Sequence, residues 1–372
     1  MTSRTDRGLV SNWWWTVDRW FLAAFLSLMV LGIVLSFAAS PAVAARIGLE
    51  EYHFVTRQIV FMLPALAVML GVSFLEPRQI RRLAILLLIG SIVLMVLALF
   101  IGVEIKGSRR WVSLAGISLQ PSEFLKPAFV VICAWLFAEH ARQPDIPGNL
   151  FAMILLGLVV TLLVAQPDLG QTMLVVGTWG VMFFMAGMAW LWIALLGALG
   201  LGGAVAAYIF FPHVAARIDK FLTGEGGTFQ TNMAREAMIS GGWFGRGPGE
   251  GDVKNVLPDS HTDFIFSVAA EEFGLALCFL LVALFAFIVL RGLKIALREY
   301  DDFTRFAVAG LVIQFGLQSI INMSVNLHLM PAKGMTLPFI SYGGSSLFSM
   351  GPWMGQVLAL RRKRAETRRS CL

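Results

Sequence analysis

Long apolar runs, separated by short polar connections, fill almost the whole chain. Each run is about 20 residues long, the length that an α-helix needs to cross a bilayer. Only helices and closed barrels span a bilayer, because its core offers no water to backbone groups, and the runs do not alternate as barrel strands do. We therefore predict an all-α, polytopic membrane fold with about ten transmembrane helices. The predicted helices cover residues 20–40, 57–75, 83–102, 121–139, 148–165, 170–186, 190–211, 264–290, 304–327 and 339–360.

Two long connections fall on the same, outer side of this predicted topology. They cover residues 103–120 and 212–263, and the larger one lies between the seventh and eighth helices. The larger connection is rich in glycine, and we predict a short helix within it over residues 231–239. Long loops of this kind are commonly functional. The chain thus divides into a cytoplasmic N-terminal segment (1–19), one transmembrane domain (20–360) and a basic cytoplasmic tail (361–372).

Composition supports the membrane class and orients the fold. Hydrophobic residues make up 58% of the chain and charged residues only 14%, whereas soluble domains carry roughly 25% charged residues. The net charge of +6 is spread over short connections and the tail, which the positive-inside rule assigns to the cytoplasm. This scatter argues against a nucleic-acid partner and predicts that both termini are cytoplasmic. The three cysteines show neither disulfide nor metal-site spacing.

The segment before the eighth apolar run concentrates polar chemistry. Residues 257–263 supply two carboxylates, an imidazole and two hydroxyls directly ahead of a helix that we expect to begin at Phe264. Ionisable side chains beside a membrane are costly and tend to mark function, so Asp263 is the candidate reactive group. The alternative is that Asp263 lies in a first helical turn, where the helix dipole favours it without any function. His261 is an alternative base or a structural residue.

Cations on the outer side suggest an acidic ligand, because arginine and lysine bind phosphate through charge-assisted hydrogen bonds. Ordinary solvated loop charge is the alternative for each of them. We favour function for Arg110, which adjoins Trp111. The outer cations are Lys106, Arg109, Arg110, Arg217, Lys220, Arg235, Arg246, Lys254 and Lys333.

Glu123 and Lys126 are three residues apart on the fourth predicted helix and therefore share a face. They form either a structural ion pair or a site in which Lys126 meets phosphate or a carboxylate of the eighth helix. Glu271 and Glu272 are the candidates for that carboxylate, about 12 Å below Asp263, and we expect one of them to face Lys126.

Two further groups have simpler interpretations. Asp168 is expected to cap the sixth helix, and Asn322 and Asn326 to form interhelical hydrogen bonds or substrate contacts.

Five short motifs, in order among the predicted helices, resemble those of the SEDS family (shape, elongation, division and sporulation) of polytopic peptidoglycan glycosyltransferases. The resemblance runs from about Trp20 to the basic tail. The segments KGMTLP (333–338) and GGWFGRGPGEG (241–251) are similar to the cell-division branch of the family. The five motifs are GSRRW (107–111), QPSEFLK (120–126), QPDLG (166–170), LPDSHTDF (257–264) and PFISYGGSS (338–346).

The resemblance implies an inverting polymerisation of lipid II into glycan strands at the outer face of the cell inner membrane, at the division site, with loss of undecaprenyl pyrophosphate. It implies a class B penicillin-binding protein and other division proteins as partners. Cofactors are left open: the sequence offers no metal-ligand cluster, and a divalent cation (Mg or Mn) is compatible with the reaction. Asp263 matches the family's essential acid, and the predicted substrate-binding residues are Arg110, Lys126, Glu123, His261, Arg246, Lys333 and Ser341.

Two positions depart from the family pattern. Asp259 stands where a glutamate is common. Asn255 stands where some division members carry an acid, so we do not carry that acid's role over. Two alternative functions remain open from the sequence. A lipid II flippase would move lipid without forming polymer and would favour a polar site near the middle of the bilayer. A non-catalytic divisome scaffold would be inactive even with its transpeptidase partner.

Overall fold

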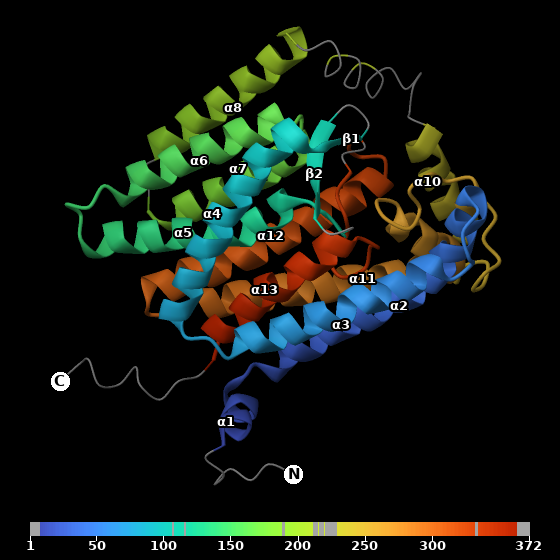
Figure 1. Cartoon of the computed structure of the whole chain (residues 1–372), viewed down its shortest axis with the longest axis horizontal. Helices are drawn as coiled ribbons and strands as arrows, with labels where there is room; N and C mark the ends of the chain where they lie inside the picture. The colour runs from blue at the N-terminus through green and yellow to red at the C-terminus, as the bar shows by residue number, and fades with distance from the viewer. Residues whose placement is uncertain are drawn as a thin grey trace.

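The chain folds into a helical bundle in which helices occupy all ten predicted apolar ranges (Figure 1). The computed structural model describes residues 8–105, 108–114, 117–187, 190–210, 215, 219, 229–331 and 334–362. Within these residues, seven helices are long and apolar enough to span a membrane: α2 to α6, α11 and α12. The count of ten crossings stays a prediction. The bundle helices are α2 (Arg19–Ile47), α3 (His53–Ser73), α4 (Pro77–Ile101), α5 (Pro121–Arg142), α6 (Gly148–Ala165), α7 (Leu169–Met185), α8 (Trp190–Phe210), α11 (Ile265–Ala296), α12 (Asp302–Asn326) and α13 (Gly344–Leu360).

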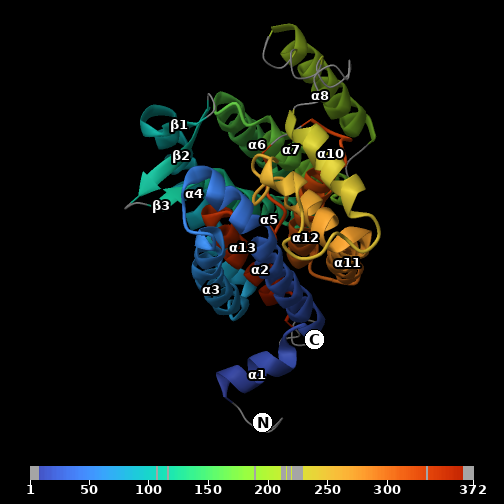
Figure 2. The ribbon, with the colours of Figure 1, turned by 90° about the vertical axis from the view of Figure 1, so that its right-hand side faces the viewer.

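Helices α5 and α12 form the centre of the bundle. In their most apolar stretches, 72% of α5 and 78% of α12 is buried inside the protein. Helix α13 packs closely against α3 and also contacts α5 and α12, whereas α8 stands at the outer edge of the bundle (Figures 1 and 2). Polar side chains on α5 and α12 are therefore shielded from lipid, and they are the ones available to build an internal network.

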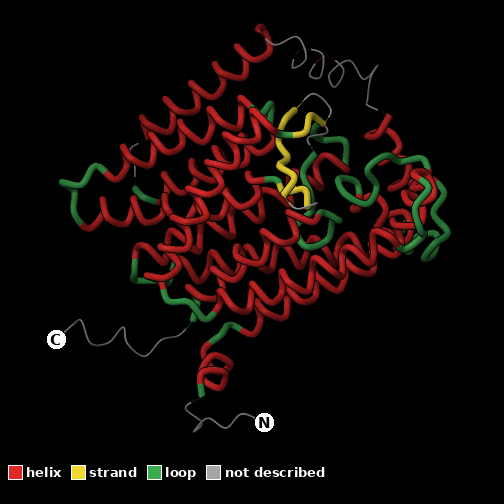
Figure 3. Tube along the Cα trace, viewed as in Figure 1, coloured by secondary structure: helices red, strands yellow, loops and turns green. Residues whose placement is uncertain are grey.

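The segments outside the bundle gather at its two ends. Strands β1 (Val103–Ile105), β2 (Ser108–Leu114) and β3 (Ile117–Leu119) form a small antiparallel sheet in the order β1-β2-β3. This sheet lies on the same side of the bundle as α10 (Phe229–Gly241), and helix α1 (Leu9–Thr16) projects from the other side (Figure 3). The all-α prediction holds for the bundle, but the sheet in the 103–120 connection was not predicted. Helix α10 confirms the short helix predicted over 231–239.

Two helix ends differ from the prediction for local reasons. Helix α2 continues to Ile47, beyond the predicted end at 40, and ends at Gly48 in the left-handed region (φ 69°). Helix α13 begins at Gly344 instead of 339. Phe339 adopts a left-handed φ of 63°, and the Leu337 N–H donates to the Ser341 hydroxyl (2.8 Å), so residues 337–341 form a turn in place of a helical start.

Helix α11 is broken at Gly274, which corrects the prediction of a continuous eighth helix. Gly274 has φ 75° and ψ −176°, a conformation that only glycine adopts readily. The backbone groups released by the break pair with the glycine-rich segment 241–251, because unpaired groups at membrane depth cost several kcal/mol. The Glu271 and Glu272 carbonyls accept from the N–H groups of Arg246 (2.9 Å) and Gly247 (3.1 Å), and the Leu275 and Ala276 N–H groups donate to the carbonyls of Gly242 (3.0 Å) and Trp243 (3.2 Å).

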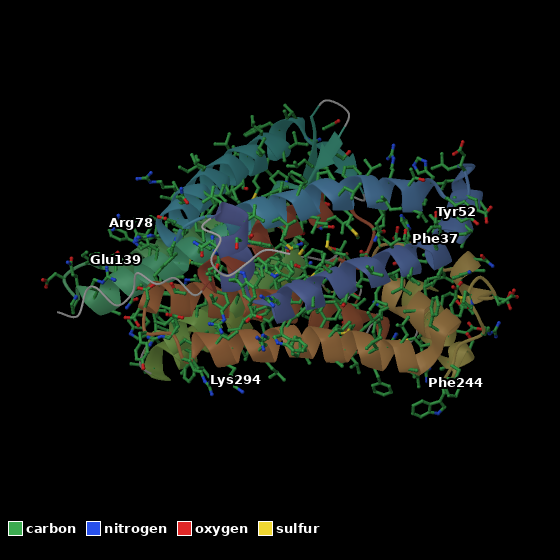
Figure 4. The ribbon with its side chains drawn as sticks, turned by 90° about the horizontal axis from the view of Figure 1, so that it is seen from below. Phe37, Tyr52, Arg78, Glu139, Phe244 and Lys294 are labelled. Carbon is green, nitrogen blue, oxygen red and sulfur yellow. The ribbon has the colours of Figure 1, made fainter. Side chains whose placement is uncertain are left out.

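The glycines of segment 241–251 are needed for this close approach. A Cβ atom on Gly241 would lie 1.9 Å from the Ala270 carbonyl oxygen, and one on Gly245 would lie 2.1 Å from the Glu272 carbonyl oxygen. Phe244, in the same segment, is 87% exposed and projects beyond the ribbon (Figure 4). The segment is thus an ordered strap across the break in α11, and its aromatic tip faces outward.

Candidate active site

Asp263 lies two residues before α11 begins at Ile265, and Phe264 is the N-cap. The interpretation that places Asp263 in the first helical turn is therefore wrong. Its backbone carbonyl accepts hydrogen bonds from the side-chain amides of Asn322 (3.0 Å) and Asn326 (2.9 Å) of α12. Asn326 also accepts from the Ser267 N–H (3.1 Å) and hydroxyl (2.7 Å) in the first turn of α11. The interhelical bond predicted for these asparagines is confirmed for Asn326, which bonds to Ser267 of α11, whereas the Asn322 amide bonds to carbonyls outside the helices, at Asp263 and Met335.

The two residues before Asp263 are held from the other side by the turn that precedes α13. The Ser341 hydroxyl donates to the Thr262 carbonyl (2.5 Å), and the Tyr342 N–H donates to the His261 carbonyl (2.9 Å). Ser341, a predicted substrate-binding residue, is only 1% exposed, and its hydroxyl is used within the protein. Three consecutive carbonyls, at 261, 262 and 263, are thus fixed by separate partners.

The Asp263 side chain is only partly buried and lies beside Gly334. One carboxylate oxygen, Oδ2, is 3.7 Å from the position that a Cβ atom on Gly334 would occupy. The following residues are held against α12: Asn322 donates to the Met335 carbonyl (2.6 Å), and Gln318 donates to the Thr336 carbonyl (3.0 Å). Lys333, another predicted substrate-binding residue, lies outside the described residues.

Lys126 is buried at the centre of a polar network between α5, α7 and α12. Its ammonium donates to Glu123 (3.0 Å) and to the Gln318 side chain (2.8 Å), and it lies 5.6 Å from the centre of the Trp353 ring. Glu123 also accepts from the Gln171 amide (2.8 Å). The ion pair predicted from the i, i+3 spacing is present. Since Lys126 is 0% exposed, a direct contact with substrate stays a prediction that this arrangement does not favour.

Arg110 on β2 contacts the turn between α6 and α7. Its guanidinium donates to the carbonyls of Gln166 (3.1 Å) and Pro167 (2.5 Å) and lies 3.4 Å from the Asp168 carboxylate. Asp168 caps α7 by accepting from the Gln171 N–H (3.3 Å), which confirms the capping prediction. Arg110 is therefore connected through Asp168, Gln171, Glu123 and Lys126 to Gln318, and from there to the loop beneath Asp263.

The prediction that Glu271 or Glu272 pairs with Lys126 is wrong. Both carboxylates instead hold the 3₁₀ turn η1 (Val253–Asn255) of the outer loop. Glu271 accepts from the N–H groups of Val253 (2.7 Å) and Lys254 (2.9 Å), and Glu272 forms a buried ion pair with Lys254. The strap across the break in α11 brings η1 to this face of the helix, so the carboxylates face the outer loop and not α5.

His261 is packed among aromatic rings close to Asp263. Its ring centre is 4.4 Å from that of Phe54 and 5.4 Å from that of Tyr342. The pKa of His261 is lowered to about 4, mainly by burial; the nearby Asp259 carboxylate opposes this shift, and the Arg46 cation adds a smaller lowering effect. The imidazole is therefore neutral near pH 7 and has the surroundings of a structural side chain. The substrate contact predicted for it stays a prediction.

Exposed cations lie on the outer loop, at Arg246, and at the end of α2, at Arg46. Arg246 pairs with Asp252 (2.7 Å), and 38% of its side chain is exposed. Arg46, in the last turn of α2, donates to the carbonyls of Val256 (3.4 Å) and Leu257 (2.9 Å). Arg46 is absent from the outer cations predicted from the sequence, because those lie in the two long outer connections and in the last one, and not in the short connection after the first helix. Within the described part of the chain, no three His, Cys, Asp or Glu side chains gather into a metal-binding group.

Together these features define a polytopic helical membrane protein that holds a partly exposed carboxylate at one end of its bundle. Comparison with known families identifies it further. Residues 18–366 match the FtsW/RodA/SpoVE family model, described as "Cell cycle protein". The chain belongs to this family, as the five sequence motifs indicated.

Relatives and solved structures agree with this assignment. The chain is 49% identical to "Probable peptidoglycan glycosyltransferase FtsW" of Caulobacter vibrioides over 97% of this chain and 93% of that protein. It is 34% identical to the protein of the same name from Methylococcus capsulatus, over 96% and 94%. A chain from a peptidoglycan synthase complex that coordinates polymerization and crosslinking superposes with a TM-score of 0.79 at 28% identity, covering 93% of this chain and 97% of that one. For the rod shape determining protein RodA of Thermus thermophilus, the TM-score is 0.70 at 28% identity, covering 95% and 99%. The predicted likeness to the cell-division branch is thereby confirmed.

Proposed function

We propose that this protein is a peptidoglycan glycosyltransferase of cell division. It polymerises lipid II into glycan strands at the outer face of the plasma membrane and releases undecaprenyl pyrophosphate. The proposal is supported by relatives of that name at up to 49% identity over nearly the whole chain. It is also supported by the solved peptidoglycan synthase complex, whose chain has the same fold.

The central feature of the proposed mechanism is the Asp263 carboxylate. Asp263 deprotonates the 4-hydroxyl of the acceptor N-acetylglucosamine, and the resulting oxygen attacks the anomeric carbon of the donor N-acetylmuramic acid. The bond to the pyrophosphate breaks with inversion. General-base catalysis contributes roughly 10²–10⁴-fold, and it depends on a base held in position. The fixed carbonyls of residues 261–263 support this role, because they hold the backbone while the carboxylate stays partly exposed.

Cations stabilise the negative charge on the departing diphosphate, and we assign two different roles to the charged residues of the site. Arg110, Lys126 and Glu123 act indirectly in this proposal, by holding α5, α7 and α12 and the 334–337 loop beneath Asp263. The diphosphate is met by exposed cations of the outer loop and of the end of α2, including Arg246 and Arg46. Preorganised charge of this kind is usually the largest electrostatic contribution to catalysis.

The proposed setting follows from the family and from the charge pattern. Lipid II enters from the outer leaflet, and both chain termini lie in the cytoplasm, as the positive-inside rule indicates. A class B penicillin-binding protein is the proposed transpeptidase partner, within a larger division assembly in the inner membrane. The solved complex that joins polymerization and crosslinking supports a partner of this kind.

The test is an assay of the purified full-length chain with labelled lipid II, with and without the transpeptidase. We expect polymer from the wild type and at least 100-fold less from a folded Asp263→Asn variant. Lipid II translocation into proteoliposomes is measured in parallel. Translocation without polymer would support a flippase, and no polymer even with the partner would support a scaffold; either result contradicts the proposal.

A further inference from the structure

A second charged site lies at the far end of α11 from Asp263. A cavity of about 310 Å³ is lined by Arg291, Lys294, Ile295, Arg298 and Glu299 of α11 and its C-terminal end, and by Arg361 at the end of α13. At 1.5 Å per residue, the stretch of α11 from Ile265 to Arg291 is at most roughly 40 Å long, close to the thickness of a bilayer with its headgroup regions. Figure 4 shows Lys294 and Phe244 toward opposite ends of α11, both pointing away from the ribbon. The cavity therefore lies at the opposite membrane surface from the candidate active site.

Three cations at the end of α11 meet at this cavity. Arg291 and Lys294 are three residues apart on the helix and share a face, and Arg298 lies in the turn that follows Ala296. Arg361 approaches from α13, a separate element. The cavity volume falls at the lower end of the roughly 300–1,000 Å³ that is typical of small-molecule sites. Two helices thus build one hollow from basic side chains.

Positive charge at this cavity exceeds the negative charge around it. Four cations line it against the single carboxylate of Glu299. Asp18 is shared by two guanidinium groups, at 2.9 Å from Arg291 and 3.5 Å from Arg361. In the part of the chain that the structure describes, no carboxylate oxygen lies within 4 Å of the nitrogens of Lys294 or Arg298. The Arg291 Nε is buried and has no hydrogen-bond partner among the described residues.

Basic residues at the cytoplasmic surface need no ligand by themselves, because the positive-inside rule accounts for them. Arg78 and Arg82, exposed on α4, illustrate that ordinary case. The α11 cluster differs because its cations share a cavity and outnumber the nearby carboxylates. The apolar side chains of Phe287 and Leu290, just before the cluster on α11, are also 38% and 66% exposed, as expected for a surface that meets acyl chains.

We propose that this cavity binds the phosphate group of an anionic phospholipid of the cytoplasmic leaflet. Guanidinium groups bind phosphate oxygens in bidentate pairs, and lysine adds a point charge. Basic pockets between transmembrane helices on this side are suited to such headgroups. The assignment of this site to the cytoplasmic leaflet rests on the membrane orientation that is part of the proposed function. Binding of phosphate at the cavity does not depend on the proposed catalysis. Free inorganic phosphate offers the same chemistry without the acyl chains.

The test counts lipids retained by the purified full-length chain in native mass spectrometry, after incubation with cardiolipin or with phosphatidylcholine. The probe variant is Lys294→Gln/Arg298→Gln, which spares the cations paired with Asp18. Arg78→Gln/Arg82→Gln is the control, with the same loss of charge at the same surface. We expect the wild type and the control to retain cardiolipin over phosphatidylcholine, and the probe variant to bind it about tenfold more weakly than the control does.

Other outcomes are equally informative. A second arm replaces lipid with inorganic phosphate and follows thermal stability. Stabilisation by phosphate that the probe variant loses and the control keeps, without lipid retention, would support the anion site and assign it to free phosphate. Equal weakening of cardiolipin binding in both double variants would overturn the proposal, because surface charge alone would then explain it. Absence of both cardiolipin retention and phosphate stabilisation in the wild type would also overturn it.

Discussion

At the scale of single residues, one face of α12 carries four buried amide side chains at every fourth position: Gln314, Gln318, Asn322 and Asn326. Gln318, Asn322 and Asn326 donate to backbone carbonyls of the 334–337 loop and of Asp263. Buried amides are costly unless they are paired. The last three amides of this series are paired with segments next to the candidate base, whereas the Gln314 amide has no hydrogen-bond partner among the described residues. The sequence places these residues within an apolar helix but does not indicate their partners. Asp263 lies 59 or more positions away along the chain, and Met335 and Thr336 lie in a separate loop, so these contacts depend on tertiary packing.

The asparagine contacts predict a defined loss on mutation. Replacing Asn322 with alanine removes the bonds to the carbonyls of Asp263 and Met335, so we expect roughly 1–3 kcal/mol less stability. Lipid II polymerisation should fall about tenfold or more, because the base loses its fixed position. Ser319→Ala is the control: its hydroxyl bonds only to the Phe315 carbonyl of its own helix. Similar polymerisation rates for the two folded variants would argue against a positioning role.

His261 predicts how stability depends on pH. Its pKa is about 4 in the folded protein and 6.5 in the unfolded chain. Between these values the unfolded state binds more protons, so stability is fully present above pH 6.5 and decreases as the pH falls toward 4. The slope approaches 1.4 kcal/mol per pH unit at most. Denaturant unfolding at pH 4.5 and 7 should show a smaller pH effect in His261→Gln than in the wild type, and an unchanged pH effect would contradict the assignment.

At the scale of elements, the glycine-rich strap decides the shape of α11. Segment 241–251 resembles a flexible linker in composition, yet its backbone completes the hydrogen bonds of a broken helix. The same packing places η1 against Glu271 and Glu272, and so fixes the loop that leads to Asp263. Lys254 anchors this loop further by donating to the Ala38 carbonyl of α2 (3.2 Å).

A single added methyl group tests the strap. In Gly241→Ala, the Cβ would lie 1.9 Å from the Ala270 carbonyl oxygen, so the strap must move away from α11. We expect a loss of roughly 1–3 kcal/mol, as for other overpacked sites, together with reduced polymerisation. Gly157→Ala in α6, where nothing lies within 4 Å of the added atom, should leave stability unchanged or raise it slightly. Thermal unfolding in detergent compares the two, and equal melting temperatures would contradict the close contact.

The elements that the sequence predicted well are the apolar helices, whose length and hydrophobicity are set by the bilayer. All ten apolar ranges are helical, because backbone groups in lipid have few other solutions. The errors lie where tertiary contacts override local pattern: the break at Gly274, the turn before α13 and the small sheet after α4. The spacing of Glu123 and Lys126 predicted their pairing, whereas the partner of Glu272 depended on the path of the strap.

For the candidate site itself, the sequence singled out the relevant motifs but not how each residue acts. Asp263 was identified from its place beside an apolar helix, and the structure leaves its carboxylate partly exposed. Ser341, Glu123 and Lys126 were expected to touch substrate, but they are buried and bonded within the protein. Motif resemblance cannot separate residues that contact a ligand from residues that hold those that do, because family motifs include both kinds.

At the scale of the whole molecule, the two ends of the bundle carry different chemistry. One end holds Asp263, the strap and the small sheet, and the other holds the ion pairs of Asp18 with Arg291 and Arg361. The latter tie the start of α2 to the ends of α11 and α13, and they place the basic side chains together. This polarity predicts the orientation of the protein in the membrane.

Thiol labelling can establish that orientation. In a Cys371→Ser background, the remaining cysteines, Cys133 and Cys278, are buried. A cysteine introduced at the exposed Glu250 should react with a membrane-impermeant maleimide in intact spheroplasts, and one at the exposed Arg78 should react only after permeabilisation. The reverse pattern would place the Asp263 end in the cytoplasm and remove its access to an extracellular substrate.

The carboxylate of Asp263 is the group on which the proposed activity depends most. Its most direct test compares the rate of lipid II polymerisation by Asp263→Asn and Asp259→Asn, in the presence of the transpeptidase. Both changes replace a carboxylate by an amide in the same loop, and asparagine tolerates the left-handed φ of 53° at position 259. We predict a fall of roughly 10²–10⁴-fold for Asp263→Asn and a rate within about threefold of wild type for Asp259→Asn. A folded Asp263→Asn variant that polymerises at the wild-type rate would contradict the account.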